Sequence, residues 1–332
     1  MDMASVSRRD LLAMAPIALA PASAAAETAP PEQDGPAAKK RLLPRSTIFK
    51  GTDRFEKIVA KARKEEWRAF PIGKRVIAFA RELHGTPYQN FTLEIDDKIE
   101  SPSVNLLGLD CWTFFEISLG FARMIAVEKS RYTPEDLLRQ VEFTRYRGGR
   151  CTGNYLERIH YLAEWFFEND ARGTCRHLTP DLPGAERISG RRISEMTVLW
   201  KSYRYLRNNP DLRTPMGKWE ARVAAMPIYH VPKSRVAEIE PKLQDGDIIG
   251  VATKHHGGFC SHVGLVVRTK DGVARFMHAS RNYKKVVIDK SVSGYLNDFS
   301  SHAGAIVGRP LEVNHTVTDP GKYQANLKKL IG

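Results

Sequence analysis

The chain has 332 residues, of which 42% are hydrophobic and 27% are charged. These proportions are those of a globular protein with a buried core, so a disordered or fibrous chain is excluded. The formal net charge of +13 favours anionic partners. The Lys and Arg residues are scattered and are not interleaved with aromatic residues as in a nucleic-acid-binding module, so we expect no nucleic-acid partner.

Residues 1–26 have the features of an export signal peptide. The motif Ser7-Arg8-Arg9-Asp10-Leu11-Leu12 resembles a twin-arginine signal, and a short apolar stretch and a run of small residues follow it. The apolar stretch is too short for a transmembrane helix. No cysteine follows at a lipidation position, so we expect a periplasmic monomer, exported by the twin-arginine route, with no membrane anchor after cleavage. A general secretory signal with a chance Arg-Arg pair is the alternative.

The remaining chain divides into three parts. Residues 27–50 are rich in Pro and Ala and are predicted to be a disordered linker. Residues 51–312 are predicted to form one domain, and residues 313–332 form a tail with no strong pattern. In the domain, helices are expected at residues 54–67, 72–83, 155–169 and 193–207. Antiparallel strands are expected later, at residues 245–251, 261–267, 275–280, 286–288 and 304–307, which is an α+β arrangement.

A further helix is expected to begin at Cys111. Apolar residues recur along it at three- and four-residue spacing, at Phe114, Ile117, Phe121 and Ile125. Asp110 suits the N-cap, which places Cys111 in the first turn. There the unpaired backbone N–H groups and the helix dipole favour the nucleophilic thiolate. The Asp110 carboxylate would oppose a thiolate, so we expect it to point away or to be used in capping.

Two histidines are expected to face each other across a hairpin. Asp271-Gly272 separates the strands predicted at residues 261–267 and 275–280, and this dipeptide is a strong hairpin signal. His262 lies near the start of the first strand and His278 near the end of the second. A cysteine nucleophile needs a histidine base and a group that orients this base. We therefore predict a triad of Cys111, His262 as the base and His278 as the orienting residue.

Several segments, taken together, resemble the NlpC/P60 superfamily of papain-like cell-wall hydrolases. More narrowly they resemble its DUF1460 branch, which is N-acetylmuramoyl-L-alanine amidase-like. The resemblance extends from about residue 70 to about residue 311. It implies a papain-like α+β fold in which the nucleophile helix packs on a central antiparallel sheet, with helical insertions. The segments that carry it are Gly85-Thr86-Pro87-Tyr88, Leu109-Asp110-Cys111-Trp112-Thr113-Phe114-Phe115-Glu116, Arg158-Ile159-His160-Tyr161, Gly246-Asp247-Ile248-Ile249, Ser261-His262-Val263-Gly264 and His278-Ala279-Ser280.

The resemblance implies a cysteine amidase that hydrolyses the N-acetylmuramoyl-L-alanine bond of peptidoglycan or its fragments, without a metal or an organic cofactor. A γ-D-glutamyl-diaminopimelate endopeptidase and a non-catalytic cell-wall-binding module are the alternatives. The resemblance also places Tyr88 beside the nucleophile. Arg158, His160 and Tyr161 are expected on one helical turn, where the arginine holds a substrate carboxylate or forms a structural ion pair.

The other cysteines leave two questions open. Cys151 and Cys175 lie in Gly-containing turns and could form a disulfide in an oxidising compartment, although sequence cannot fix the pairing. Cys260 is two residues from His262, so the two side chains share a face of the predicted strand. No spacing typical of a metal site accompanies this pair, and we expect no role for Cys260.

Overall fold

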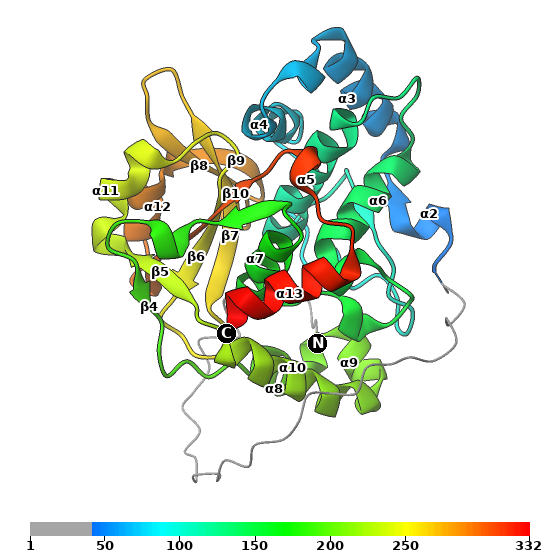
Figure 1. The fold of residues 1–332 in the computed structure, drawn as a ribbon. Coiled ribbons are helices and arrows are strands. Elements are labelled where there is room, and N and C mark those ends of the chain that lie inside the picture. Colours follow the sequence, from blue (N-terminus) through cyan, green and yellow to red (C-terminus); the bar gives the residue numbers. More distant parts are fainter. Residues whose placement is uncertain (1–41) are drawn as a thin grey trace.

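The computed structural model describes residues 42–332, so the predicted export signal and most of the predicted linker lie outside the described residues. Helices cover one face of a curved sheet, and Figure 1 shows the sheet on one side with α3 to α6 on the other. Every strand pair in the main sheet is antiparallel. The predicted combination of helices with an antiparallel sheet is therefore confirmed. None of the described helices is long and apolar enough to cross a membrane.

Within residues 42–332, eight strands form the main sheet in the order β4-β5-β10-β6-β7-β8-β9, and β3 also pairs with β10. The five predicted strand segments all overlap β6 to β10. Strands β1 and β2 form a separate parallel pair. The bounds are β1 Phe49–Lys50, β2 Val104–Asn105, β3 Cys175–His177, β4 Glu186–Arg187, β5 Tyr229–Pro232, β6 Ile248–Thr253, β7 Cys260–Arg268, β8 Ala274–Ser280, β9 Lys285–Ser291 and β10 His302–Pro310.

The helices surround α5, which packs on β7 and β8 and contacts both α4 and α6. The helix predicted at residues 72–83 is confirmed as α4, and the one at residues 54–67 ends earlier, as α3. The bounds are α2 Arg45–Ile48, α3 Thr52–Lys64, α4 Ile72–Glu82, α5 Cys111–Ala126, α6 Pro134–Arg145, α7 Leu162–Ala171, α8 Glu195–Val198, α9 Arg204–Asn208, α10 Arg213–Ala225, α11 Val236–Ile239, α12 Val292–Asn297 and α13 Pro320–Ile331.

Helix α5 is buried on every side and is not amphipathic as its spacing suggested. All of its residues from Trp112 to Ile125 are buried, because helices cover the faces that the sheet does not. The polar residues on these faces are paired inside the protein. Glu116 is fully buried, accepts a hydrogen bond from Arg145 Nε at 2.7 Å and another from Trp165 Nε1 at 3.1 Å. These contacts fix the helix, and with it the position of Cys111.

Both ends of the predicted domain are longer than expected. Helix α2 and strand β1 lie inside the segment predicted to be a linker, and Ile48 and Phe49 of this segment are buried in the core. The tail contains α13, which lies against α7 (Figure 1). Tyr323 and Leu327 of α13 are buried in the same core. The folded body therefore includes residues on both sides of the predicted boundaries at 51 and 312.

Two predicted helices are interrupted. At residues 155–169, a 3-10 turn at Tyr155–Glu157 is followed by an extended segment before α7 begins at Leu162. The extended segment pairs with the end of α6, since Ile159 N–H donates to Arg145 O at 2.9 Å. The helix predicted at residues 193–207 is likewise divided into α8, a 3-10 turn at Trp200–Ser202 and α9.

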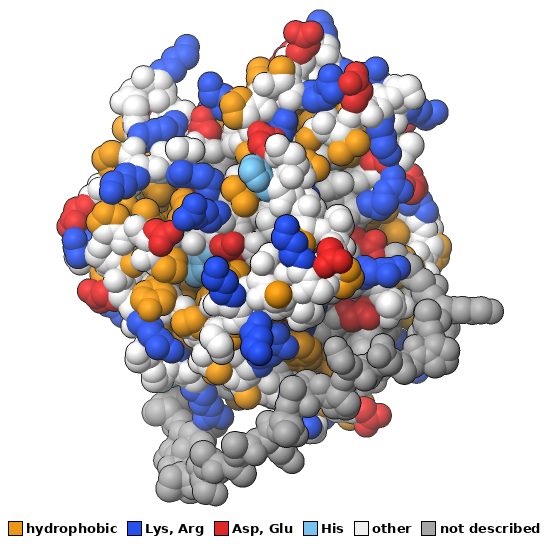
Figure 2. All heavy atoms as spheres, in the orientation of Figure 1, with side chains coloured by type: hydrophobic (Ala, Val, Ile, Leu, Met, Phe, Trp, Pro, Cys, Tyr) orange, Lys and Arg blue, Asp and Glu red, His pale blue; other side chains and the backbone are white. Residues whose placement is uncertain are grey.

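The basic residues are spread over the surface. Figure 2 shows Lys and Arg side chains across one face, with Asp and Glu side chains among them. Several of these residues form exposed ion pairs, such as Arg176 with Asp181 and Lys290 with Asp298. Exposed pairs of this kind contribute little to stability. The positive net charge of the chain therefore acts mainly by attracting anions over long distances.

Candidate active site

Cys111 is the first residue of α5, as its sequence context predicted. The Asp110 side chain caps the helix, because its Oδ1 accepts a hydrogen bond from Thr113 N–H at 2.8 Å. Asp110 N–H in turn donates to Thr113 Oγ1 at 3.1 Å, and Thr92 Oγ1 donates to Asp110 Oδ2 at 2.7 Å. Both carboxylate oxygens are thus occupied by donors. The Asp110 carboxylate is therefore used in capping α5, as expected from the sequence.

The hairpin of β7 and β8 brings His262 and His278 into direct contact. Their facing nitrogens, Nε2 of His262 and Nδ1 of His278, are 2.7 Å apart. Gly264 permits this packing, because a Cβ at that position would lie 2.5 Å from Met277 O and 2.6 Å from the ring of Phe276. The Phe276 ring therefore lies close over β7 and packs edge-on against His262. The predicted juxtaposition of the two histidines is confirmed.

Strand β9 adds a carboxylate that the sequence reasoning missed. Val287 pairs with His278, and Asp289 lies two residues farther on, on the same face of the sheet. His278 Nε2 is 3.4 Å from Asp289 Oδ2, while Asp289 Oδ1 accepts a hydrogen bond from Lys290 N–H at 2.8 Å. The contact with His278 lowers the pKa of the Asp289 carboxyl. Three neighbouring strands thus supply a row of His262, His278 and Asp289.

This row fixes where the protons lie. Burial lowers the pKa of His278, although Asp289 acts in the opposite direction, so the ring is neutral near pH 7. A carboxylate only accepts hydrogen bonds, so Nε2 of His278 carries the proton and Nδ1 accepts. His262 must then donate from Nε2, so in its neutral form the Nδ1 nitrogen is unprotonated. The basic lone pair of His262 is therefore on the nitrogen that faces away from His278.

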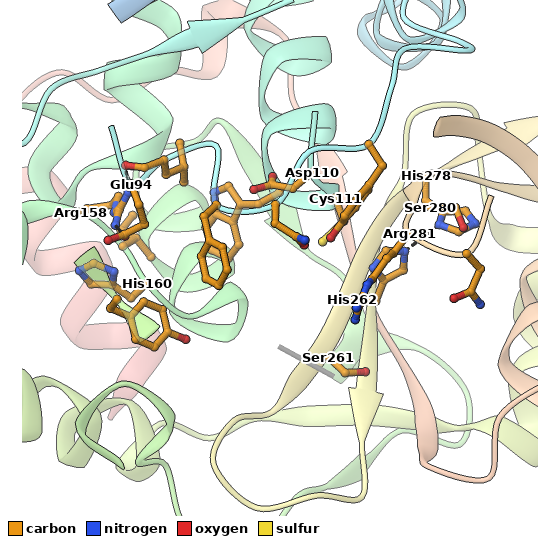
Figure 3. Close-up of a pocket in the computed structure, with 18 of the residues that line it drawn as sticks. Glu94, Asp110, Cys111, Arg158, His160, Ser261, His262, His278, Ser280 and Arg281 are labelled. Carbon is orange, nitrogen blue, oxygen red and sulfur yellow. Dashed lines mark hydrogen bonds and ion pairs between the residues drawn. The ribbon is translucent and has the colours of Figure 1, made fainter. Parts of the chain in front are cut away.

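A cavity of about 420 Å³ lies in front of these residues and is lined by Cys111, His262 and His278 (Figure 3). Tyr88 lines it as well, as the sequence predicted. Its backbone N–H donates to Lys284 O at 2.9 Å, and its segment runs parallel to Leu109, just before the nucleophile. Tyr88 is therefore held beside Cys111 by backbone pairing on both sides.

The predicted trio of Arg158, His160 and Tyr161 is not on a helix, because residues 158–161 are extended. Arg158 is buried, and its Nη2 donates to Glu94 Oε1 at 2.6 Å, so the structural ion pair is the alternative that the structure supports. His160 lines the cavity and contacts Tyr155 O through Nε2 at 3.1 Å. The Tyr161 hydroxyl donates to Glu220 Oε1 at 2.6 Å and lies outside the large cavity.

Arg281 is a cation of this cavity that the sequence reasoning did not consider. It follows Ser280 at the end of β8, only three residues after His278, and it is half-buried. Figure 3 shows its side chain near His262, on the opposite side of Cys111 from Arg158. The sequence signal for Arg281 was its position directly after the predicted strand that carries His278, since site residues often lie where a strand ends in a loop.

The disulfide considered between Cys151 and Cys175 is absent, and none of the four cysteines, all of which lie in residues 42–332, is in a disulfide. The two side chains pack against different partners. Cys151 Sγ lies 3.5 Å from Glu100 O, whereas Cys175 fills the space above Gly308 of β10, where a Cβ would lie 2.8 Å from its sulfur. Burial raises the pKa of Cys151 to about 12. In residues 42–332, no group of three or more His, Cys, Asp or Glu side chains is arranged to hold a metal ion.

A family comparison identifies the chain. Residues 78–302 match the AmiA-like family model, described as N-acetylmuramoyl-L-alanine amidase-like. The chain belongs to this amidase-like family. The match covers more than half of the chain and includes Cys111 and every residue of the row. A comparison with curated proteins found no match.

Solved structures agree with the amidase-like family. An N-acetylmuramoyl-L-alanine amidase from Bacteroides uniformis is 27% identical, with a TM-score of 0.64, over 73% of this chain and 99% of that one. A Bacteroides fragilis protein named as a candidate xylanase is 29% identical, with a TM-score of 0.61, over 70% and 99%. A Legionella pneumophila protein of the DUF1460 family shares the fold at 16% identity, with a TM-score of 0.56, over 79% and 97%. The predicted resemblance to the amidase-like DUF1460 branch is confirmed.

Proposed function

We propose that this chain is a cysteine amidase of the papain-like NlpC/P60 type that hydrolyses the N-acetylmuramoyl-L-alanine bond of peptidoglycan or its fragments. The observation that carries the proposal is the meeting of two elements in one cavity. Cys111 begins a buried helix there, and His262 begins a row of hydrogen-bonded side chains that ends at Asp289. Membership of the amidase-like family supports amide hydrolysis and this choice of bond.

The first step activates the thiol. His262 Nδ1 carries the basic lone pair, so it can take the proton from Cys111 Sγ. The imidazolium that forms is stabilised through His278 by the Asp289 carboxylate, in the way a triad carboxylate stabilises its histidine. The thiolate then attacks the carbonyl carbon of the lactyl group of N-acetylmuramic acid. His278 and Asp289 act as positioning residues, because neither touches the reacting atoms.

The following steps use the same groups. We assign stabilisation of the developing oxyanion to the backbone N–H groups at the start of α5, with the Tyr88 hydroxyl assisting them. His262 gives its proton to the alanine nitrogen, so the C–N bond breaks and the stem peptide leaves. A water molecule, deprotonated by His262, then hydrolyses the thioester, and the muramyl carboxylate is released with Cys111 regenerated.

The two arginines that line the cavity have different roles in the proposal. Arg158 is committed to Glu94, and burial near Glu100 and Glu94 fixes its charge inside the wall of the cavity. Arg281 lies at the half-exposed edge, so we assign to it the contact with a stem-peptide carboxylate. The predicted export signal would deliver the enzyme to the periplasm, where peptidoglycan is found.

Mass spectrometry of digested muropeptides tests the choice of bond. The proposal expects a free stem peptide and a muramyl product that has lost every amino acid. A muropeptide that retains L-Ala-D-Glu would instead identify a γ-D-glutamyl-diaminopimelate endopeptidase and refute the amidase. A Cys111→Ala variant with an unchanged melting temperature should give neither product.

Thiol labelling separates an enzyme from a non-catalytic wall-binding module. An activated nucleophile should react with iodoacetamide near neutral pH faster than free cysteine does. Cys260 is a built-in control, because burial raises its pKa to about 12 and keeps its thiol protonated. Peptide mapping should therefore find the label on Cys111 first. Labelling of Cys111 no faster than free cysteine would contradict the mechanism.

A further inference from the structure

A second, much smaller cavity of about 40 Å³ adjoins the nucleophile. It shares Cys111, His262 and His160 with the large cavity, so the thiol lies where the two cavities meet. A group bound in the small cavity would therefore be attached directly to the amide that is attacked. Neither the family match nor the similar structures assign a ligand to this space.

The walls of the small cavity come from four separate parts of the chain, including the start of α5, and most of them are apolar. Leu162 and Ala163 begin α7, Met196 lies in the short helix α8, Phe259 precedes β7 and Val263 lies in β7 beside His262. All five are buried. This composition is typical of a subsite for an apolar group.

Several polar side chains of these walls form hydrogen bonds within the protein. The Tyr203 hydroxyl donates to Glu195 Oε1 at 2.6 Å, and the Tyr161 hydroxyl donates to Glu220 Oε1 at 2.6 Å. Cys260 also lines the space, and its neutral thiol packs as a small apolar group. A charged or strongly hydrated ligand group would have to compete with these internal hydrogen bonds, whereas an apolar group would not.

The size of the cavity sets a limit on the ligand group. A water-sized group needs roughly 10–15 Å³ by this measure, so the cavity of about 40 Å³ holds about three or four such groups. A methyl or ethyl group fits into this space. A leucine or phenylalanine side chain does not fit unless the walls move.

We propose that the small cavity is a subsite for the methyl group beside the scissile amide, a proposal that rests on the amidase function above. The N-acetylmuramoyl-L-alanine bond has a methyl group on each side, one on the lactyl carbon and one on the alanine Cα. The γ-D-glutamyl-diaminopimelate bond has on its acyl side a methylene chain that continues to a carbon bearing a carboxylate, and on its amine side a long side chain that ends in charged groups. A subsite of this size and polarity therefore selects the first bond over the second.

Two series of synthetic amides test the subsite and identify which methyl group occupies it. In the first series the lactyl group is constant and the amine is glycine, L-alanine, L-2-aminobutyrate or L-leucine. In the second, L-alanine is constant and the acyl group is lactyl or glycolyl. We expect one series to show a fall in kcat/KM of roughly tenfold or more when the methyl group is removed. If the alanine methyl occupies the subsite, leucine should also be cleaved at least tenfold more slowly than alanine.

Substitutions in the walls should change the ratio of kcat/KM between substrates. Val263→Ala enlarges the cavity and should raise the ratio for the larger group, while Ala163→Leu fills it and should abolish the advantage of the methyl group. Val267→Ala is the matched control, because Val267 is buried in the same strand but does not line the cavity. A ratio does not depend on the folded fraction, so loss of stability cannot imitate the result.

The outcomes separate the two proposals. If the enzyme cleaves none of these amides, the amidase function itself is wrong. If it cleaves all of them at rates within about twofold, and the wall substitutions leave the ratios unchanged, the amidase stands and the methyl subsite is refuted. Unequal rates that Val267→Ala alters as much as Val263→Ala would also refute the subsite.

Discussion

Replacing Asp289 with asparagine tests the proton arrangement of the site. Lys290 N–H donates to Oδ1 of Asp289 at 2.8 Å, so the amide oxygen of the new side chain would occupy the Oδ1 position. Its NH2 group would then face His278 Nε2 and force that nitrogen to accept a hydrogen bond. His278 would have to carry its proton on Nδ1 and donate to His262, so the base nitrogen of His262 would become protonated. The variant therefore holds the base in the wrong tautomer.

The size of the effect follows from these hydrogen bonds. For His262 to recover an unprotonated Nδ1, one of the buried hydrogen bonds in the row must break, which costs about 1–3 kcal/mol. The loss of the carboxylate charge adds to this cost. We expect kcat to fall roughly 100-fold for Asp289→Asn. Asp289→Ala removes the carboxylate without imposing a tautomer, and because the contact is long at 3.4 Å we expect a fall of roughly tenfold. The more conservative substitution should thus be the more harmful one.

The assay is the rate of release of L-alanine peptide from a muramyl peptide as a function of pH. Without the carboxylate the imidazolium of His262 is easier to deprotonate, so the acid limb of kcat/KM, which reports formation of the neutral base, should move to lower pH in both variants. Asp298→Asn is the matched control, because Asp298 binds the Lys290 side chain at the surface and lies outside the cavity. Wild-type kcat for Asp289→Asn, or a smaller loss than for Asp289→Ala, would refute the proton arrangement.

Three further predictions concern stability and binding. Burial lowers the pKa of His177 to about 4. Between about pH 6.5 and pH 4, the unfolded chain therefore binds a proton at this residue and the folded chain does not. The free energy of unfolding should fall by about 3 kcal/mol as the pH drops from 7 to 4, and His177→Phe should remove this part of the fall in urea titrations. Glu116→Gln leaves the Arg145 charge buried without its partner and should lower the free energy of unfolding by about 3–5 kcal/mol. Asp181→Asn, which breaks the exposed pair with Arg176, is the control and should change this free energy by less than about 1 kcal/mol. Arg281→Gln should raise KM about tenfold for peptides with carboxylates, but not for an amide that lacks them.

The sequence predicts the start of α5 at Cys111 best, because the signals for this helix start are local. Asp110 and Thr113 are three residues apart and cap each other, so the start of α5 needs no information from the rest of the fold. The contact of His262 with His278 was predictable for a similar reason, since a single tight hairpin at Gly272 sets the register of β7 against β8. Local hydrogen bonds and short turns carry this part of the site.

The missed features depend on contacts distant in sequence. The spacing at residues 155–169 is helical, but Ile159 pairs with the backbone of Arg145 and the chain becomes extended there. Asp289 is recognisable only when the register of β9 on β8 places it beside His278. The start of helix α13 had a sequence signal, because Asp319 is the N-cap and accepts a hydrogen bond from Lys322 N–H. Only two residues of this helix are buried, which is too few to give a clear helical spacing of apolar residues.

The most direct test of the central claim is to trap the covalent intermediate and to map it. Rapid acid quenching of the enzyme with a muramyl peptide, followed by intact-mass measurement and peptide mapping, identifies the residue and the acyl group together. We predict a thioester on Cys111 that carries the muramyl group without any amino acid. An adduct of L-Ala-γ-D-Glu on Cys111 would contradict the choice of bond, and an adduct on any other residue would contradict the nucleophile.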